Sequence, residues 1–177
     1  MKPNELGCVH VYTGEGKGKT SSAMGLATRA HGRGYKVKIV QFFKRNTGEQ
    51  KTFQKLDIPY TQFSPLHPYF KDYDDPSFVQ LREDFHIFWT EQMKDVLEGV
   101  YDVVILDEVG PALAWNVCKD ELVLDLLKKK PKGMELVLTG RGMPTSVKEE
   151  ADYVTEMQMV KHPYEEKGIQ ARIGIEY

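Results

Sequence analysis

The sequence has few cysteines and no large excess of either charge. Its 177 residues include two cysteines, 24 Lys and Arg, and 26 Asp and Glu. The formal net charge is −2. Cys8 and Cys118 are too few for a disulfide framework, and we expect buried, inert thiols in a reducing compartment. The near-balance of charge gives no general electrostatic basis for binding nucleic acid or a membrane, so neither is an expected partner.

Targeting and membrane signals are also missing. The first residues are not followed by a signal-peptide apolar region, and no apolar run approaches membrane-spanning length. The 41% hydrophobic and 28% charged composition is ordinary for a globular protein. We therefore expect a cytoplasmic protein with one domain over residues 1–177.

Common catalytic signatures are absent as well. The histidines show no metal-ligand spacing, and there is no Cys/His cluster. No nucleophile elbow or Ser-His-Asp pattern appears either. The sequence therefore offers no evident covalent nucleophile.

The sequence does have a glycine-rich loop that ends in Gly-Lys-Thr. Residues 13–20 read Thr-Gly-Glu-Gly-Lys-Gly-Lys-Thr, between a strand-like run at 9–12 and a helical stripe at 23–30. In such a loop, backbone N–H groups point at phosphate oxygens, Lys19 adds a point charge, and Thr20 can ligate Mg²⁺. Thr13 stands where the standard pattern has Gly, which leaves a glycine-rich hairpin turn as the alternative. The order of strand, loop and helix favours nucleotide binding.

Strand and helix patterns alternate along the chain. Apolar runs predict strands at 9–12, 37–43, 101–106, 135–139, 153–157 and 169–175, and helices are predicted at 23–30, 75–98, 121–130 and 144–151. Residues 44–76 predict little regular structure apart from a short helix at 51–56. Asp75 is the expected N-cap of the long helix, and residues 161–164 are expected to form a turn. The alternation predicts an α/β fold with a mostly parallel sheet flanked by helices.

Two acids follow the most apolar strand. Asp107 and Glu108 come directly after four apolar residues, at the sheet edge where the glycine-rich loop is also expected. One carboxylate can hold Mg²⁺, and the other can act as a base, a ribose contact or a further metal-shell group. The alternative is an acid that caps the next turn. Arg141 follows another strand end and suits phosphate oxygens, although a surface salt bridge is the commoner role of Arg.

Several motifs occur together in a fixed order. They are residues 12–21 (YTGEGKGKTS), 27–30 (ATRA), 41–44 (QFFK), 48–49 (GE), 106–108 (LDE), 138–141 (LTGR), 151–157 (ADYVTEM), 161–163 (KHP), 168–169 (GI) and 174–176 (GIE). This set resembles the ATP:corrinoid adenosyltransferases of the CobA/CobO/BtuR type over nearly the whole chain. The resemblance implies a RecA-like P-loop NTPase fold and a homodimer. It also implies transfer of the 5′-deoxyadenosyl group of ATP to Co(I) of a corrinoid, with release of triphosphate, in adenosylcobalamin biosynthesis or salvage.

The resemblance also implies roles for individual residues. ATP would be bound by Gly14, Glu15, Gly16, Lys17, Gly18, Lys19, Thr20, Ser21 and Arg29, and we add Arg141 from its position. Mg²⁺ would be held by Thr20, Asp107 and Glu108, and Lys19, Thr20 and Glu108 are the candidate catalytic residues. The separate roles of the two acids stay open.

The corrinoid contacts are the least defined part of the resemblance. Several family members carry a Gly-x-Gly-Phe-x-Trp segment before the long helix, which this chain lacks. The aromatic candidates in the same interval are Phe63, Tyr69, Phe70 and Tyr73. The implied substrates are ATP and a corrinoid, with a flavoprotein as the implied reductant. The alternatives are a RecA-like P-loop ATPase or kinase, and an ATP- or corrinoid-binding protein without turnover.

Overall fold

A single parallel sheet runs through the protein. The computed structural model describes residues 7–45 and 47–176. Its six strands are β1 (Val9–Thr13), β2 (Val37–Phe42), β3 (Tyr60–Phe63), β4 (Val103–Asp107), β5 (Glu135–Thr139) and β6 (Tyr153–Glu156). They lie in the order β3-β2-β4-β5-β1-β6, and every neighbouring pair is parallel. The carboxyl ends of all six strands therefore meet at one edge, where ligands gather in such sheets.

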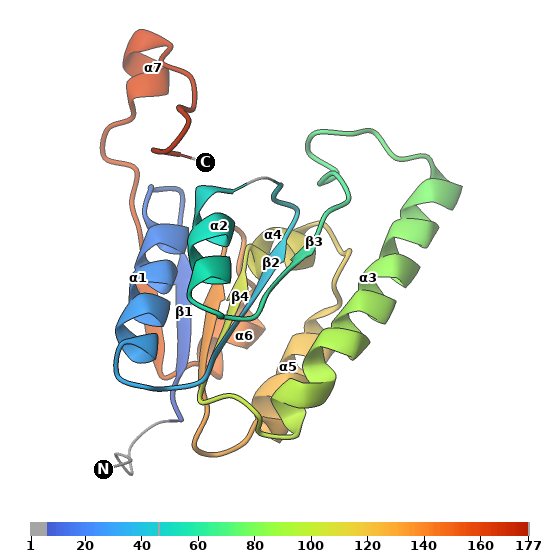
Figure 1. The fold of residues 1–177 in the computed structure, drawn as a ribbon. Helices are drawn as coiled ribbons and strands as arrows, with labels where there is room; N and C mark the ends of the chain where they lie inside the picture. The colour runs from blue at the N-terminus through green and yellow to red at the C-terminus, as the bar shows by residue number, and fades with distance from the viewer. Residues whose placement is uncertain (1–6, 46, 177) are drawn as a thin grey trace.

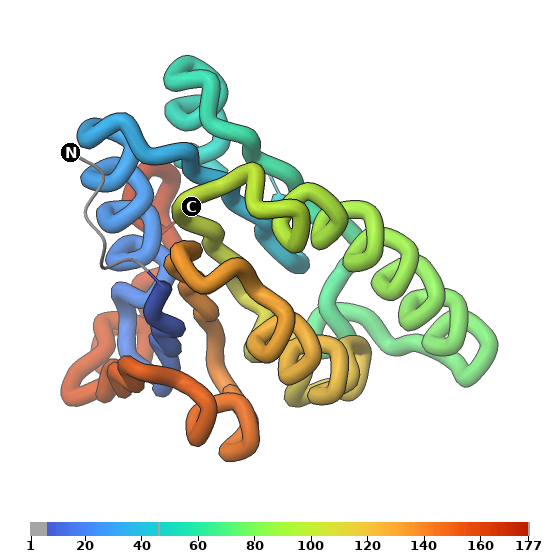
Figure 2. The backbone as a smooth tube through the Cα atoms, turned by 90° about the horizontal axis from the view of Figure 1, so that it is seen from below, coloured from blue at the N-terminus to red at the C-terminus, as the bar shows by residue number. Residues whose placement is uncertain are grey.

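Helices cover both faces of the sheet (Figure 1). They are α1 (Lys19–His31), α2 (Gly48–Lys55), α3 (Asp75–Leu97), α4 (Val109–Ala114), α5 (Asp120–Lys129), α6 (Thr145–Glu149) and α7 (Pro163–Lys167). In Figure 2, α1 and α2 lie on one side, and α3 and α5 run side by side on the other. Among the described residues, no helix has the length and apolarity needed to cross a bilayer.

The core forms two clusters because strand side chains alternate between the faces. On β4, Val104 and Leu106 join the cluster that includes α3, α4, α5 and α6. Val103 and Ile105 face the opposite way and pack in the cluster with α1 and α2. Burial on both faces explains why the central strands are rich in apolar residues.

The long interval before α3 contains more structure than the sequence predicts. β3 adds an edge strand beside β2, and α2 begins at Gly48 rather than at residue 51. Asp74, rather than Asp75, caps α3 by accepting the Ser77 N–H at 3.0 Å. β3 has only four residues and no clear apolar alternation, so its pairing with β2 stabilises it.

The predicted strand at 169–175 is wrong. These residues form coil and a turn, and the sheet ends at β6. The isoleucines at 169, 173 and 175 are exposed, with no neighbouring strand to pair with them. The expected turn at 161–164 instead leads into α7, which His162 caps by accepting the Tyr164 N–H.

Candidate nucleotide and metal site

The glycine-rich loop lies at the carboxyl edge of the sheet, between β1 and α1. Gly14 and Gly18 adopt φ values of 92° and 117°, in the left-handed region that favours glycine. The Gly16 N–H donates to the Met157 carbonyl at 2.6 Å, and the Met157 N–H donates to the Thr13 carbonyl at 2.9 Å. The chain that leaves β6 therefore holds the loop in place.

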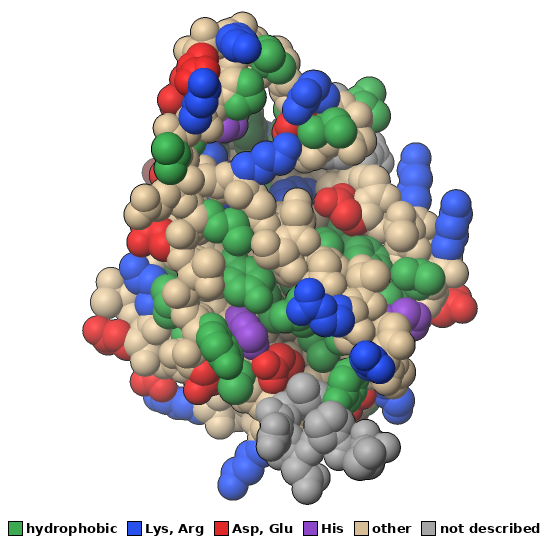
Figure 3. Space-filling model, turned by 90° about the vertical axis from the view of Figure 1, so that its left-hand side faces the viewer, with side chains coloured by type: hydrophobic (Ala, Val, Ile, Leu, Met, Phe, Trp, Pro, Cys, Tyr) green, Lys and Arg blue, Asp and Glu red, His purple; other side chains and the backbone are tan. Residues whose placement is uncertain are grey.

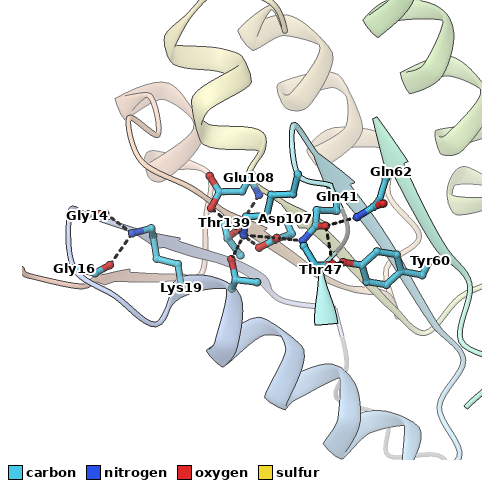
Figure 4. A network of polar contacts seen from close by, with 12 residues as sticks. Gly14, Gly16, Lys19, Gln41, Thr47, Tyr60, Gln62, Asp107, Glu108 and Thr139 are labelled. Carbon is cyan, nitrogen blue, oxygen red and sulfur yellow. Dashed lines mark hydrogen bonds and ion pairs between the residues drawn. The ribbon is translucent and has the colours of Figure 1, made fainter. Parts of the chain in front are cut away.

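Lys19 is buried at the mouth of this loop (Figure 4). Its Nζ donates to the Gly14 and Gly16 carbonyls, both at 2.7 Å. Burial lowers the pKa of Lys19, and the nearby Arg141 lowers it further, while Glu108 and Glu15 oppose both effects. The loop carbonyls thus hold the Lys19 ammonium within the loop, where a triphosphate could meet a positive charge.

The two acids after β4 have different environments. Asp107 is 0% exposed; its Oδ1 accepts from Thr139 Oγ1 at 2.7 Å, and its Oδ2 accepts from Gln41 Nε2 at 2.8 Å. Glu108 is partly exposed, has a φ of 63°, and its N–H donates to Thr139 Oγ1 at 3.0 Å. Asp107 is thus held rigidly by buried donors, whereas the Glu108 carboxylate has greater access to solvent.

Lys44 joins the loop to the acids. It belongs to the motif at 41–44, but no role was predicted for it. Its Nζ lies 2.7 Å from Thr20 Oγ1, 3.2 Å from Asp107 Oδ2 and 3.4 Å from Glu108 Oε1. Burial would lower the pKa of Lys44, but the charges of Asp107 and Glu108 and their hydrogen bonds outweigh it and raise the pKa. The side chain is therefore an ammonium ion surrounded by three acceptor oxygens.

A network of polar side chains on β2 and β3 and at Thr47 is hydrogen-bonded to Asp107. Gln41 is fully buried in β2, and its Oε1 accepts from Gln62 Nε2 at 2.7 Å and from Thr47 Oγ1 at 3.4 Å. Thr47 in turn lies 3.1 Å from the Tyr60 hydroxyl, and burial raises the pKa of Tyr60. A glutamine in the mostly apolar strand β2 was the sequence signal for this network.

The two predicted arginines differ in position. Arg141 lies beside the loop, where its Nε pairs with Glu15 Oε2 at 3.1 Å. Arg29 is exposed in the last turn of α1. At about 1.5 Å per residue, it lies roughly 15 Å along the helix from Lys19. The structure therefore does not bring Arg29 to the cluster around Lys19 and Lys44, and its phosphate contact stays a prediction. Of the other predicted loop residues, Lys17 and Ser21 are exposed.

The four aromatic candidates also separate. Phe63 packs in the core against Phe85 and Phe88, so it has no open face for a corrin ring, contrary to expectation. Tyr73 is half-buried, and its hydroxyl donates to the Leu66 carbonyl at 2.7 Å. Tyr69 and Phe70 are 73% and 74% exposed, at the tip of the segment between β3 and α3.

His67 anchors this segment on α4. Its Nδ1 accepts the Tyr69 N–H at 3.0 Å, so Nε2 carries the proton toward the Pro111 carbonyl, 3.4 Å away. The ring also makes edge contacts with Phe43 and Trp115, at centroid distances of 4.8 and 5.5 Å. Burial lowers the pKa of His67, although the Pro111 carbonyl and the charge of Glu108 oppose this effect.

The donor set around Lys44 fits a hard divalent cation. Among residues 7–45 and 47–176, no three His, Cys, Asp or Glu side chains group into a metal site. Mg²⁺ needs no such cage, since it is usually held by one or two carboxylates, waters and substrate phosphates. Thr20, Asp107 and Glu108 supply suitable oxygens, and the Lys44 ammonium shows that they attract a cation.

The loop, the buried Lys19 and the acids after β4 define a P-loop NTPase-like fold with a candidate nucleotide site at its sheet edge. The family model described as "ATP:corrinoid adenosyltransferase BtuR/CobO/CobP" matches residues 5–177. The chain belongs to this family of transferases, which favours the adenosyltransferase interpretation over an ATPase, a kinase or a non-catalytic binder.

Curated relatives extend over nearly the whole chain. A corrinoid adenosyltransferase of Escherichia coli (strain K12) is 32% identical over 98% of this chain and 87% of its own length. One of Pseudomonas aeruginosa is 32% identical over 98% of this chain and 85% of the relative. The corrinoid adenosyltransferase CobA of Salmonella typhimurium is 29% identical over 98% and 87%.

Proposed function

We propose that the protein transfers the 5′-deoxyadenosyl group of MgATP to Co(I) of a corrinoid and releases triphosphate. The observation that carries the proposal is the convergence of Lys19, Thr20 and the Asp107–Glu108 pair on one sheet edge in a chain of this family. Co(I) of the corrinoid substrate attacks the ribose C5′ carbon, and the C5′–oxygen bond to the triphosphate breaks. The substrate supplies the nucleophile, so the protein needs no covalent one.

The protein's contribution is to bind and orient the triphosphate as a leaving group. The N-terminus of α1 and the loop amides other than that of Gly16, which bonds to Met157, would face the phosphates, and the Lys19 ammonium would stabilise the charge that develops on the departing oxygen. Arg141, which pairs with Glu15 at the loop, would add a fork of donors. Gly14, Gly16 and Gly18 permit the close approach of the backbone.

Mg²⁺ would be held by Thr20 and Glu108, with Asp107 as an additional or water-mediated contact. Asp107 already accepts bonds from Thr139 and Gln41, which orient its carboxylate, whereas Glu108 has greater access to solvent. When bound, the ion would neutralise charge on the phosphates. This arrangement supports distinct roles for the two acids.

The exposed aromatic pair supports a corrinoid-binding role for the segment before α3. Tyr69 and Phe70 offer their rings to solvent, and Trp115 is partly exposed beside His67. Apolar rings of this kind suit the face of a corrin macrocycle. A homodimer, a flavoprotein electron donor and a cytoplasmic location complete the proposal. The two free thiols, Cys8 and Cys118, fit a reducing compartment.

Product identity tests this function directly. We expect anaerobic incubation with chemically reduced cobalamin and MgATP to give a cobalt–carbon bond, seen by absorbance, and one triphosphate per adenosyl group. Orthophosphate release would indicate an ATPase or kinase instead. Tight ATP binding without product would indicate a non-catalytic binder.

Lys19→Ala gives the matching mutational prediction. Loss of one preorganised cation should reduce turnover by about 10²–10³-fold with little change in fold, because the ammonium faces the developing charge. Turnover is measured by triphosphate release, and circular dichroism checks the fold. Lys55→Ala, at the exposed end of α2, is the control and should retain activity. Full activity of Lys19→Ala would contradict the proposed phosphate role.

A further inference from the structure

The Lys44 ammonium occupies the place proposed for the metal ion. Its three oxygen neighbours are Thr20, Asp107 and Glu108, at 2.7, 3.2 and 3.4 Å. These are the same side chains that would hold Mg²⁺. One position among them cannot hold both an ammonium and a divalent cation, because like charges at contact distance repel.

This contact differs from an ordinary structural ion pair elsewhere in the protein. The Lys38 side chain is 5% exposed, against 30% for Lys44, and its Nζ donates to the Gln92 carbonyl at 2.9 Å and to Asp95 Oδ1 at 2.6 Å. Those partners lie between β2 and α3, away from the glycine-rich loop. Lys44 instead bonds to Thr20, in the first turn of α1, where the loop presents its phosphate-binding groups.

The charge balance explains why a cation stays there. Asp107 is completely buried, and Glu108 stands next to it, so two carboxylates require compensation. Lys44 is the ammonium in contact with both acids and brings one positive charge there, with Lys19 acting on Glu108 from further away, whereas a divalent ion would bring two. The site therefore holds a cation of lower charge than the one its donors fit.

We infer that Lys44 is a tethered cation that fills the metal position in the nucleotide-free protein and is displaced when MgATP binds. This inference rests on the proposed magnesium role of Thr20 and Glu108. Free Mg²⁺ must compete with the ammonium and binds poorly by itself. Nucleotide-bound Mg²⁺ brings phosphate oxygens, toward which the flexible four-carbon stem of Lys44 can turn its charge. Metal and nucleotide thus enter together.

The test measures metal binding without nucleotide, with Mn²⁺ as an electron paramagnetic resonance probe. We expect Lys44→Gln to bind one Mn²⁺ at least about 10-fold more tightly than the wild type, because a neutral amide no longer competes. Lys55→Gln removes the same charge from an exposed site and should bind Mn²⁺ like the wild type. Lys44→Arg keeps a positive charge at this position and should bind Mn²⁺ as weakly as the wild type. Adding Glu108→Gln to Lys44→Gln should abolish the gain.

Equal Mn²⁺ binding by the wild type and Lys44→Gln, or no binding by either, would overturn the inference. Thermal unfolding provides a second measurement if Lys44→Gln is unstable. Its midpoint should fall in EDTA and rise with Mg²⁺ alone, while the wild-type midpoint stays nearly constant. If Mg²⁺ does not change the unfolding midpoint of either protein, the result would also contradict the inference that Lys44 fills the metal position.

Adenosyl transfer by the same wild-type preparation separates this inference from the proposed function. If the wild type forms product but Lys44→Gln does not bind Mn²⁺ more tightly, only the inference about Lys44 is contradicted. If Lys44→Gln binds Mn²⁺ more tightly but the wild type forms no product, the proposed function is contradicted and the inference about Lys44 is not.

Discussion

Single buried side chains hold the polar edge of the sheet in position. Asp107 accepts bonds from Thr139, Gln41 and Lys44, although it is inaccessible to solvent. Within the described part of the chain, no buried side-chain nitrogen or oxygen lacks a hydrogen-bond partner. Removing one partner would leave another group buried without its bond, which costs about 1–3 kcal/mol.

His67 makes the stability of the protein depend on pH. In the folded state its pKa lies below the ordinary value of 6.5, because burial disfavours the imidazolium. Below about pH 6.5 the unfolded chain therefore binds a proton that the native chain does not, so stability falls as the pH falls toward the folded pKa. We expect His67→Gln to lose less stability than the wild type between pH 7.5 and 5.5.

Urea unfolding at the two pH values measures this difference. The comparison uses the change in unfolding free energy with pH, so any general destabilisation by the substitution cancels. His86→Gln, on the exposed side of α3, is the control and should keep the wild-type pH dependence. An unchanged pH dependence in His67→Gln would show that this imidazole does not titrate below its ordinary range.

The sequence predicted the residues whose roles depend on local pattern. Lys19 and Thr20 belong to a contiguous motif, and Asp107 with Glu108 follows a strand whose edge the alternating fold defines. Lys44 could not be predicted in the same way, because its contacts depend on how the chain turns after β2. Burial is a tertiary property too, and it separates Phe63 in the core from the exposed Tyr69 and Phe70.

At the scale of elements, packing decides where sequence pattern is weak. β1, β2, β4 and β5 are apolar runs in the centre of the sheet, and all four are found close to their predicted limits. β3, α4 and α7 have between four and six residues, too few to show a period. The run at 169–175 has strand-forming residues but no neighbouring strand to pair with, so the strand predicted from its composition was wrong.

The glycine-rich loop and the chain after β6 form one packed unit. A Cβ on Gly16 would lie 2.6 Å from the Gln158 carbonyl oxygen and 2.7 Å from that of Met157. Gly16→Ala should therefore push the loop off this chain, weaken ATP binding at least about 10-fold, and destabilise the protein by about 1–3 kcal/mol. Isothermal titration calorimetry and urea unfolding measure these two effects.

Gly25 provides the matched control, since it is a glycine of the following helix. It lies exposed in α1, and a Cβ there would have no neighbour within 4 Å. Gly25→Ala should stabilise the protein by about 0.5–1 kcal/mol, because glycine is a poor helix former, and should leave ATP binding unchanged. Wild-type ATP affinity in Gly16→Ala would refute the packing argument.

At the scale of the whole molecule, the C-terminal segment projects beyond the sheet. α7 and the residues after it lie above α1 and the glycine-rich loop (Figure 1), and Lys17 Nζ bonds to Glu176 Oε1 at 2.7 Å. Apolar side chains are exposed on the projecting segment and on the body below it (Figure 3). In the segment from β6 onward they are Tyr153, Val154, Met159, Val160, Tyr164, Ile169, Ile173 and Ile175. A segment with this many exposed apolar side chains is a candidate interaction site.

We predict that this C-terminal surface forms the interface of the proposed homodimer. Val160 and Ile173 are 91% and 83% exposed, so both can be covered by a second copy of the chain. Val160→Asp with Ile173→Asp should convert the dimer to a monomer, because burying two carboxylates costs more than the apolar contact contributes. Sedimentation velocity measures the change, with Val79→Asp on α3 as the control that should remain dimeric. A monomeric wild type would contradict the homodimer itself. A double variant that remains dimeric would show that the interface lies elsewhere.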